Sequence, residues 1–203
     1  MSAGVLAIAA LLALLATPAV AAAMPDDMSL GSPKAPVTVT EYASLGCPHC
    51  ATWARDVFPA FKKRFIDTGR VRFVLREMLN GDPDVAAAGW LTARCAGPAH
   101  YFQVVEGLFA AEPQIAADGD DLPSLLKVAG EAGLSKVQVS ACLSDHAALA
   151  ALQKRVDTHE HADHVEGTPT FDVGGKRLAG EQSLAALTTA IDQAGRHPTG
   201  GRR

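Results

Sequence analysis

Residues 37–50 read VTVTEYASLGCPHC, a β-favouring run followed closely by two cysteines. We expect residues 37–42 to form a strand and residues 51–67 to form a helix. Cys47 and Cys50 then lie at a strand-to-helix turn, where their thiols can close into a disulfide. The sulfur of Cys47 would lie at the positive end of the helix dipole, which favours the thiolate over the thiol. The motif therefore predicts a reactive dithiol with disulfide-exchange chemistry.

The composition is that of an ordinary globular protein. Of the 203 residues, 48% are hydrophobic and 20% are charged. This length is enough for one domain with a sizeable core, or for a core domain with an insertion. The net charge is −4 and there is no large block of one sign. Nothing in the charge pattern indicates a nucleic-acid partner.

The first 23 residues predict a secretory signal peptide. They carry no charged side chain, and residues 5–15 form an apolar run of signal-peptide length. Pro18 and the small residues 19–23 follow, which is typical of a cleavage site near Ala21 or Ala23. The apolar stretch is also long enough to span a bilayer as an uncleaved anchor, but the proline and the small residues favour cleavage. No cysteine closely follows, which argues against a lipoprotein.

Export would place the four cysteines in an oxidising compartment, where thiols pair unless they are kept reduced. Four cysteines allow three connectivities. Cys47 and Cys50 can close only a very small ring, suited to cycling, which leaves Cys95 to pair with Cys142. In a chain-entropy treatment, a bridge over that span stabilises the fold by about 4 kcal/mol. The alternative is a second redox relay, which the distant spacing and the helical setting make less favourable.

The predicted elements begin with a strand–helix–strand unit. After a short lead-in over residues 24–36, the first strand connects to a long helix over residues 48–68, which Pro59 should kink. A second strand follows over residues 71–75. This βαβ unit places the dithiol at the carboxyl end of its first strand, where open α/β sheets place their active sites.

A helical block follows, because residues 83–143 carry small and apolar residues at helical spacing and no clear strand signal. We expect helices over residues 85–91, 101–110, 122–132 and 135–143, the last with Ser135 as its N-cap. The block is predicted to be a subdomain inserted into an α/β frame formed by residues 36–82 and 144–195.

The frame is completed by a helix over residues 144–164, a hairpin over residues 171–178 and an amphipathic helix over residues 181–194. The dipeptide Gly174-Gly175 provides the hairpin turn. Residues 196–203 are expected to be a disordered tail.

The segment from Glu41 to Cys50, together with the loop Gly167-Thr168-Pro169-Thr170, resembles the DsbA-like thiol:disulfide oxidoreductases of the thioredoxin superfamily. The resemblance covers residues 36–194. It implies the fold class, an α/β thioredoxin-like fold with an inserted α-helical subdomain. The pair Cys95 and Cys142 also resembles an additional helical-domain disulfide that occurs in one branch of that family.

The resemblance also assigns roles to individual residues. Cys47 would be the exposed nucleophile and Cys50 the buried resolving thiol. Pro169 would be a cis-proline facing the dithiol, and Thr168 before it would offer backbone hydrogen bonds to a substrate strand. Glu41 corresponds to the buried acidic residue beneath the active site, where it could assist proton transfer at Cys50. The alternatives are a trans proline in an ordinary loop and a solvent-exposed carboxylate at the strand end.

The two residues between the cysteines, Pro48 and His49, complete the predicted catalytic motif. His49 adds a donor, or a positive charge at lower pH, beside a thiolate that the helix N-terminus already favours. A stable thiolate is a good leaving group, so the oxidised protein should give its disulfide away. The sequence thus predicts a periplasmic oxidase without a cofactor other than its redox-active disulfide. Its partners would be folding exported proteins with free thiols and, as the resemblance implies, a reoxidising membrane protein.

Other interpretations of the dithiol remain open. An isomerase or reductase of the same fold is one, although isomerases of the family carry an N-terminal dimerisation region. Residues 24–36 are short for such a region, so we expect a monomer. C-x-x-C can also be half of a zinc site or an inert staple, but no second C-x-x-C accompanies it. A metal-handling or assembly factor with the same two thiols is a third possibility.

The segment DTHEHADH at residues 157–164 is the feature that favours metal handling. On a helix, Asp157, His161 and His164 would share one face. A polar run on a helix is usually a solvated face, so we predict no metal site. His161 and His164 lie just before the Gly167–Thr170 loop and are candidates for bordering the dithiol and tuning it.

Overall fold

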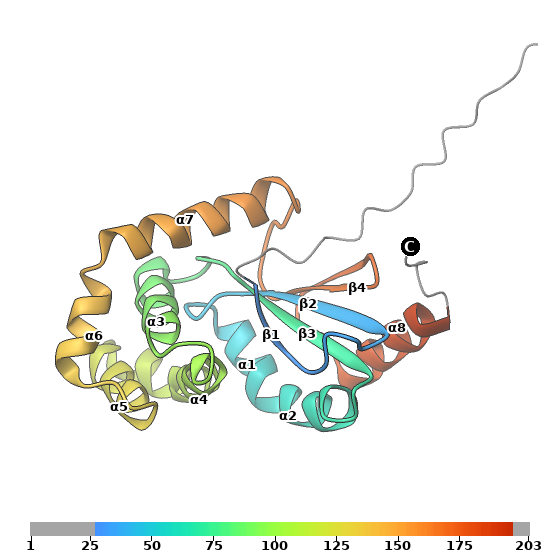
Figure 1. Cartoon of the computed structure of the whole chain (residues 1–203), viewed down its shortest axis with the longest axis horizontal. Helices are drawn as coiled ribbons and strands as arrows, with labels where there is room; N and C mark the ends of the chain where they lie inside the picture. The colour runs from blue at the N-terminus through green and yellow to red at the C-terminus, as the bar shows by residue number, and fades with distance from the viewer. Residues whose placement is uncertain (1–26, 197–203) are drawn as a thin grey trace, which may run out of the picture.

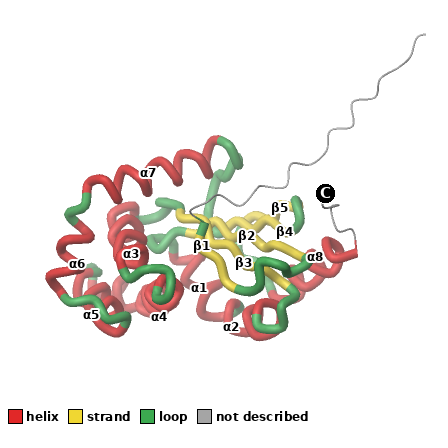
Figure 2. The backbone as a smooth tube through the Cα atoms, viewed as in Figure 1, coloured by secondary structure: helices red, strands yellow, loops and turns green. Residues whose placement is uncertain are grey.

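The computed structural model describes residues 27–196 and contains one five-stranded mixed sheet (Figure 2). The strand order is β1 (Met28–Leu30), β3 (Val71–Glu77), β2 (Val37–Ala43), β4 (Thr170–Val173) and β5 (Lys176–Ala179). Strands β2 and β3 are parallel, and the remaining pairs are antiparallel. The predicted signal peptide and all but the first residue of the predicted tail lie outside the described residues.

The helix predicted over residues 48–68 consists of three pieces. These are α1 (Pro48–Asp56), α2 (Phe58–Phe61) and the π-helical turn η1 (Lys62–Ile66). The break falls at Val57, two residues before Pro59. Pro59 has no N–H to donate to the carbonyl four residues earlier, so the helix is interrupted there.

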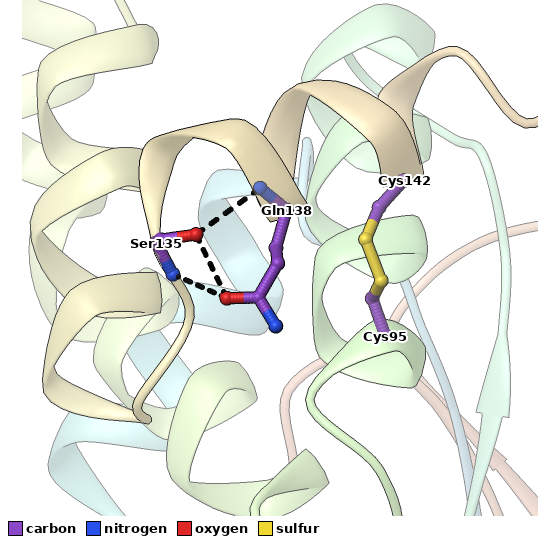
Figure 3. Close-up of a disulfide and its surroundings, with 4 residues drawn as sticks. All are labelled: Cys95, Ser135, Gln138 and Cys142. Atoms are coloured by element: carbon purple, nitrogen blue, oxygen red, sulfur yellow. Dashed lines mark hydrogen bonds between the residues drawn. A yellow bond between two sulfur atoms is a disulfide. The ribbon is translucent and has the colours of Figure 1, made fainter.

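Four helices gather at one end of the sheet (Figure 1). They are α3 (Pro83–Cys95), α4 (Tyr101–Asp118), α5 (Leu122–Glu131) and α6 (Lys136–Leu143). Helix α7 (His146–His161) leads back toward the sheet, and α8 (Leu184–Arg196) ends the described chain. Ser135 caps α6 in a capping box with Gln138 (Figure 3).

Two sequence-based expectations about these elements were wrong, and one strand was not anticipated. Helix α4 continues eight residues past Ala110 to Asp118, with Pro113 inside it. Helix α7 ends at His161 instead of His164, and His164 has a positive φ of 52°. The lead-in contains β1, a three-residue edge strand that is too short to show an alternating pattern.

One face of the sheet carries an aromatic core. Trp53 of α1 packs on Phe171 of β4 with ring centroids 4.7 Å apart, and Phe73 of β3 lies 5.9 Å from Phe61 of α2. All four rings are buried. Large aromatic groups contribute strongly to core stability through the area they bury. This core holds α1, and therefore the dithiol at its start, against the sheet.

The opposite face carries a buried ionic cluster around Arg76 of β3. The guanidinium donates to Asp27 at 3.0 and 3.1 Å, to Asp163 at 2.6 Å and to the hydroxyl of Tyr42 at 2.9 Å. Arg76 is only 2% exposed. Asp163 lies between α7 and β4, so the cluster fixes the loop that leads to Pro169.

A second buried carboxylate, Glu77, joins the sheet to three helices. It accepts hydrogen bonds from Arg94 of α3 at 2.6 Å, from Tyr101 of α4 at 3.0 Å and from Arg155 of α7 at 2.8 Å. Its side chain is 1% exposed. The desolvation of a buried carboxylate is offset only when its partners are held in good geometry, as they are here.

Cys95, the last residue of α3, forms a disulfide with Cys142 of α6 (Figure 3). Their Cα atoms lie 6.2 Å apart across 47 residues of sequence. The bridge therefore joins the first and last helices of the block. Between residues 27 and 196, no helix is both long and apolar enough to cross a membrane.

Replacing Glu77 with alanine should lower the free energy of unfolding by about 3 kcal/mol, because two arginines lose their shared buried partner. Urea denaturation monitored by circular dichroism measures this change. The control is Asp192→Ala, which removes the exposed ion pair with Arg70 and should change stability by no more than about 0.5 kcal/mol. Equal effects of the two substitutions would contradict a bracing role for Glu77.

Candidate active site

The dithiol lies in the connection between β2 and α1. Cys47 is the N-cap of α1 with an extended φ of −107°, and Pro48 occupies the first turn, where its fixed φ suits the helix. Cys47 is 6% exposed and Cys50 is fully buried. Both thiols are free in this structure. The two sulfurs are therefore unequal: partners reach Cys47 first, and Cys50 lies behind it.

The surroundings of Cys47 favour its thiolate. Its pKa is lowered to about 5, chiefly by the hydrogen bond from the Cys50 thiol, with further contributions from Thr168 and from the backbone N–H groups of Cys50 and His49. Burial opposes these contributions but does not outweigh them. A thiolate that accepts donors at a helix N-terminus is expected to have a low pKa.

The surroundings of Cys50 have the opposite effect. Burial raises its pKa well above the ordinary value, and the neighbouring Cys47 and Glu41 raise it further. Cys50 therefore stays protonated in the reduced protein and serves as a donor to Cys47. This division between one anion and one neutral thiol follows from which sulfur is desolvated.

Glu41 occupies β2 beneath the dithiol and is 3% exposed. Its Oε1 atom has no hydrogen-bond partner among the described residues. Burial raises its pKa well above the ordinary value, and the negative charge of Cys47 adds to this effect. Burial therefore favours the protonated form of Glu41 close to the dithiol.

His49 forms an exposed ion pair that the sequence did not reveal. Its Nδ1 atom lies 2.6 Å from Oε1 of Glu181, which is 132 positions away in sequence. The hydrogen bond to Glu181 raises the pKa of His49, and the Cys47 charge adds to this. The pair therefore favours a positive imidazolium beside the thiolate.

The loop that carries Pro169 faces the dithiol. The Thr168–Pro169 peptide bond is cis, and the sulfur of Cys47 lies 3.5 Å from the carbonyl oxygen of Thr168. The segment after β5 braces this arrangement, because Gly180 N–H donates to the Pro169 carbonyl at 2.8 Å and Trp53 Nε1 donates to the Gln182 carbonyl at 3.0 Å. Elements distant in sequence therefore meet at Cys47.

The histidines before this loop are arranged differently from the sequence-based expectation. Because α7 ends at His161, His164 does not share a helix face with it. His164 lines a shallow hollow beside the Pro169 loop. The buried histidine is His159, whose Nδ1 lies 3.2 Å from the Glu77 carbonyl oxygen. Across residues 27–196, no group of three or more His, Cys, Asp or Glu side chains is arranged to hold a metal ion.

The sequence is similar to known proteins over most of its length. The thioredoxin family profile matches residues 23–193. A Rickettsia conorii protein, provisionally named a protein-disulfide oxidoreductase, is 33% identical over 170 residues, covering 83% of this chain and 60% of the relative. The chain therefore spans about 60% of the length of such curated relatives.

Several solved crystal structures share the fold. Wolbachia pipientis α-DsbA1 superposes with a TM-score of 0.79 at 24% identity, covering 87% of this chain and 94% of that one. BdbD from Bacillus subtilis, in its oxidised form, gives 0.71 at 22% identity, covering 84% and 93%. The predicted fold class, a thioredoxin-like fold with an inserted helical subdomain, is confirmed.

The reduced protein should show one thiolate transition near pH 5 in its absorbance at 240 nm, and Cys47→Ser should abolish it. The pKa of Cys47 is lower in the folded protein than in the unfolded chain. The thiolate therefore stabilises the reduced fold fully above about pH 9, and this stabilisation is lost as the pH falls to about 5. At pH 7, about two pH units above the folded pKa, the thiolate contributes about 2–3 kcal/mol to the stability of the reduced form, at about 1.4 kcal/mol per unit. Denaturant unfolding of both redox forms of Cys95→Ala/Cys142→Ala measures it. A redox difference in stability that does not change with pH would contradict the assignment.

Replacing Glu181 with glutamine should lower the pKa of His49 and raise that of Cys47, because the imidazolium loses its partner and the thiolate then loses a nearby positive charge. NMR titration of the His49 ring and the 240 nm absorbance report the two changes. Glu166→Gln removes the same charge from the exposed part of the Pro169 loop and should leave the His49 pKa unchanged. If both variants shift the pKa of His49 equally, the change comes from the net charge of the protein and not from loss of the His49–Glu181 ion pair.

Proposed function

The chain belongs to the thioredoxin family, and from this membership we propose that it is a protein-disulfide oxidoreductase that donates its Cys47–Cys50 disulfide to other proteins. The observation that carries this proposal is the inequality of the two sulfurs. Cys47 has a pKa of about 5, whereas burial raises that of Cys50 far above it. The curated relatives provisionally named as protein-disulfide oxidoreductases support the same activity.

The direction of transfer follows from the thiolate. Interactions that stabilise the Cys47 anion exist only when the disulfide is open, so they favour the reduced form of the protein. A disulfide whose reduced form is stabilised is a strong oxidant. Cys47 is also a good leaving group, because a thiol of low pKa leaves readily.

The reaction proceeds in two exchanges. A substrate thiolate attacks the sulfur of Cys47, the Cys47–Cys50 bond breaks, and Cys50 leaves as a thiolate that takes up one proton. A second substrate thiolate then attacks the substrate sulfur of the mixed disulfide and releases Cys47 as a thiolate. The substrate gains one disulfide, and its two electrons remain on the enzyme dithiol.

The neighbouring groups assist these steps. Glu41, whose protonated form burial favours, gives its proton to the leaving Cys50 thiolate. The backbone of Thr168, beside Cys47, offers hydrogen bonds to an extended substrate strand. His49 stabilises the Cys47 thiolate as it is released. Pro48 and the start of α1 hold the first sulfur at the helix N-terminus.

The predicted signal peptide, together with the paired Cys95 and Cys142, supports a periplasmic location. Substrates there would be folding exported proteins with free thiols. A membrane protein would return the dithiol to its disulfide. The enzyme would act as a monomer, with its own redox-active disulfide in place of a cofactor.

Equilibration with glutathione tests the direction. In a buffer poised at about −200 mV, the Cys47–Cys50 pair should be mostly reduced, whereas a reductase would hold its disulfide under the same conditions. The oxidised protein should also introduce disulfides into a reduced, unfolded model protein. Cys47→Ser should abolish this activity, and Cys95→Ala/Cys142→Ala should retain it. Cys50→Ser should accumulate a mixed disulfide, which mass spectrometry would locate at Cys47.

A further inference from the structure

A groove borders the active-site turn where that turn meets the helical block. Its volume is about 570 Å³, and its lining includes Gly46, the residue before Cys47. The remaining walls come from the start of α3, the C-terminal part of α4 and the residues between α4 and α5. The N–H of Asp82 donates to the Gly46 carbonyl at 3.0 Å. The groove therefore begins directly beside the nucleophile.

Two glycines allow this close approach. A Cβ atom on Gly46 would lie 2.0 Å from the carbonyl oxygen of Asp82, and one on Gly81 would lie 3.2 Å from the Cα atom of Cys47. Gly81 also has a φ of 80°, which glycine adopts without steric cost. The backbone at the start of α3 therefore packs directly on the turn that carries Cys47.

The lining of the groove combines apolar side chains with carboxylates. Leu45 is buried, and Val85 and Ile115 are half-buried, whereas Asp82 and Asp84 are exposed. The apolar part therefore lies deeper than these two carboxylates. The acidic residues of the lining are Asp82, Asp84, Glu112 and Asp121.

The charge of the groove is strongly one-sided. Within the described chain, the residues that line it include no lysine, arginine or histidine. Glu112 has a cation nearby, because Arg55 of α1 lies 3.3 Å from its carboxylate. Asp82, Asp84 and Asp121 add three more negative charges along the same groove.

A lysine or arginine side chain suits this combination. Its aliphatic stem can lie on apolar surface while its charged head stays at the edge with the carboxylates. An acidic side chain would be repelled there, and an apolar one would not complement the charge. Complementary charge mainly accelerates association and excludes wrong partners. The groove therefore fits a cationic segment.

The proposed reaction brings a polypeptide to this position. A substrate is joined to Cys47 through its own cysteine, so the residues beside that cysteine must lie against the surfaces that border Cys47. The Thr168 backbone borders the sulfur from one loop, and the groove begins at Gly46. An extended chain advances about 3.3 Å per residue, so side chains two or three positions from the substrate cysteine can reach the groove.

We propose that this groove receives the basic residues that flank a substrate cysteine, so that the protein reacts preferentially with cysteines in lysine- or arginine-containing segments. This inference rests on the proposed disulfide exchange and names the class of substrate that it favours. The specificity-determining residues are Asp84 and Asp121. The other two acidic residues also have structural contacts, since Asp82 caps α3 and Glu112 pairs with Arg55.

Three peptides test the preference. Each has one cysteine, flanked on both sides by lysine, serine or glutamate. The oxidised protein is mixed with excess peptide, and acid-quenched samples are analysed by mass spectrometry for loss of the Cys47–Cys50 disulfide. The reaction of each peptide with oxidised glutathione corrects for its own thiolate content, since nearby lysine lowers a cysteine pKa. The corrected rate should be highest for the lysine peptide, and added salt should reduce the difference. Equal corrected rates would overturn the proposal.

Variants locate the preference in the groove. Exposed ion pairs are each worth a few-fold at most, so Asp84→Asn/Asp121→Asn should reduce the ratio of lysine to glutamate rates about fivefold. The side chain of Asp121 caps no backbone N–H, and the melting temperature shows whether the variant folds. Asp84→Lys/Asp121→Lys should reverse the preference, which loss of stability alone cannot do.

The matched control is Asp157→Asn/Glu160→Gln. It removes two negative charges from exposed positions on α7, outside the groove, and should keep the ratio of the unaltered protein. A ratio that is unchanged in Asp84→Asn/Asp121→Asn, or that falls equally in the control, overturns the proposal. In the second case, attraction by the net charge of the protein would account for the preference.

Failure of the donor role would be distinguishable. Both directions of exchange pass through the same mixed disulfide at Cys47. If the glutathione equilibrium were reducing, the ratio would be measured from attack of the reduced protein on the same peptides linked to glutathione. A reducing equilibrium with the preference retained refutes only the donor role. An oxidising equilibrium without the preference refutes only the groove.

Discussion

The hydrogen bond between the neutral thiol of Cys50 and the thiolate of Cys47 is the interaction on which this site depends. It exists only because the protein desolvates one sulfur and leaves the other within reach of partners. Desolvation keeps Cys50 protonated, and a protonated Cys50 can donate to Cys47. The same burial encloses the Oε1 atom of Glu41, which has no hydrogen-bond partner among residues 27–196. The reactivity of Cys47 and the protonation of Cys50 therefore have one physical cause.

Burial of this kind requires rigid support on both faces of the sheet. On one face, the packing of Trp53 against Phe171 holds α1 against the sheet. On the other face, Arg76 binds Asp163 and so fixes the approach to Pro169. Glu77 ties the helical block to the same strand as Arg76.

The parts of the fold that were predictable from the sequence are those with local signals. The strand before Cys47, the turn at Pro48 and the hairpin at Gly174-Gly175 each follow from residues within a few positions of one another. Pairings across long distances were not predictable. Glu181 meets His49 across 132 residues and Arg76 meets Asp27 across 49, and no local pattern distinguishes these charges from solvated ones. Where α7 ends could not be predicted either, because polar residues continue past His161 at helical spacing.

The same distinction explains why the dithiol was found readily and its environment was not. A C-x-x-C motif indicates a dithiol from four residues alone, but the pKa of each thiol depends on the groups that the rest of the chain places beside it. Thr168 reaches Cys47 from 121 positions away, and Glu181 reaches His49 from 132 positions away. Variation among proteins with the same four-residue motif should accordingly be sought in such surrounding groups, since they decide how fast and in which direction the dithiol exchanges.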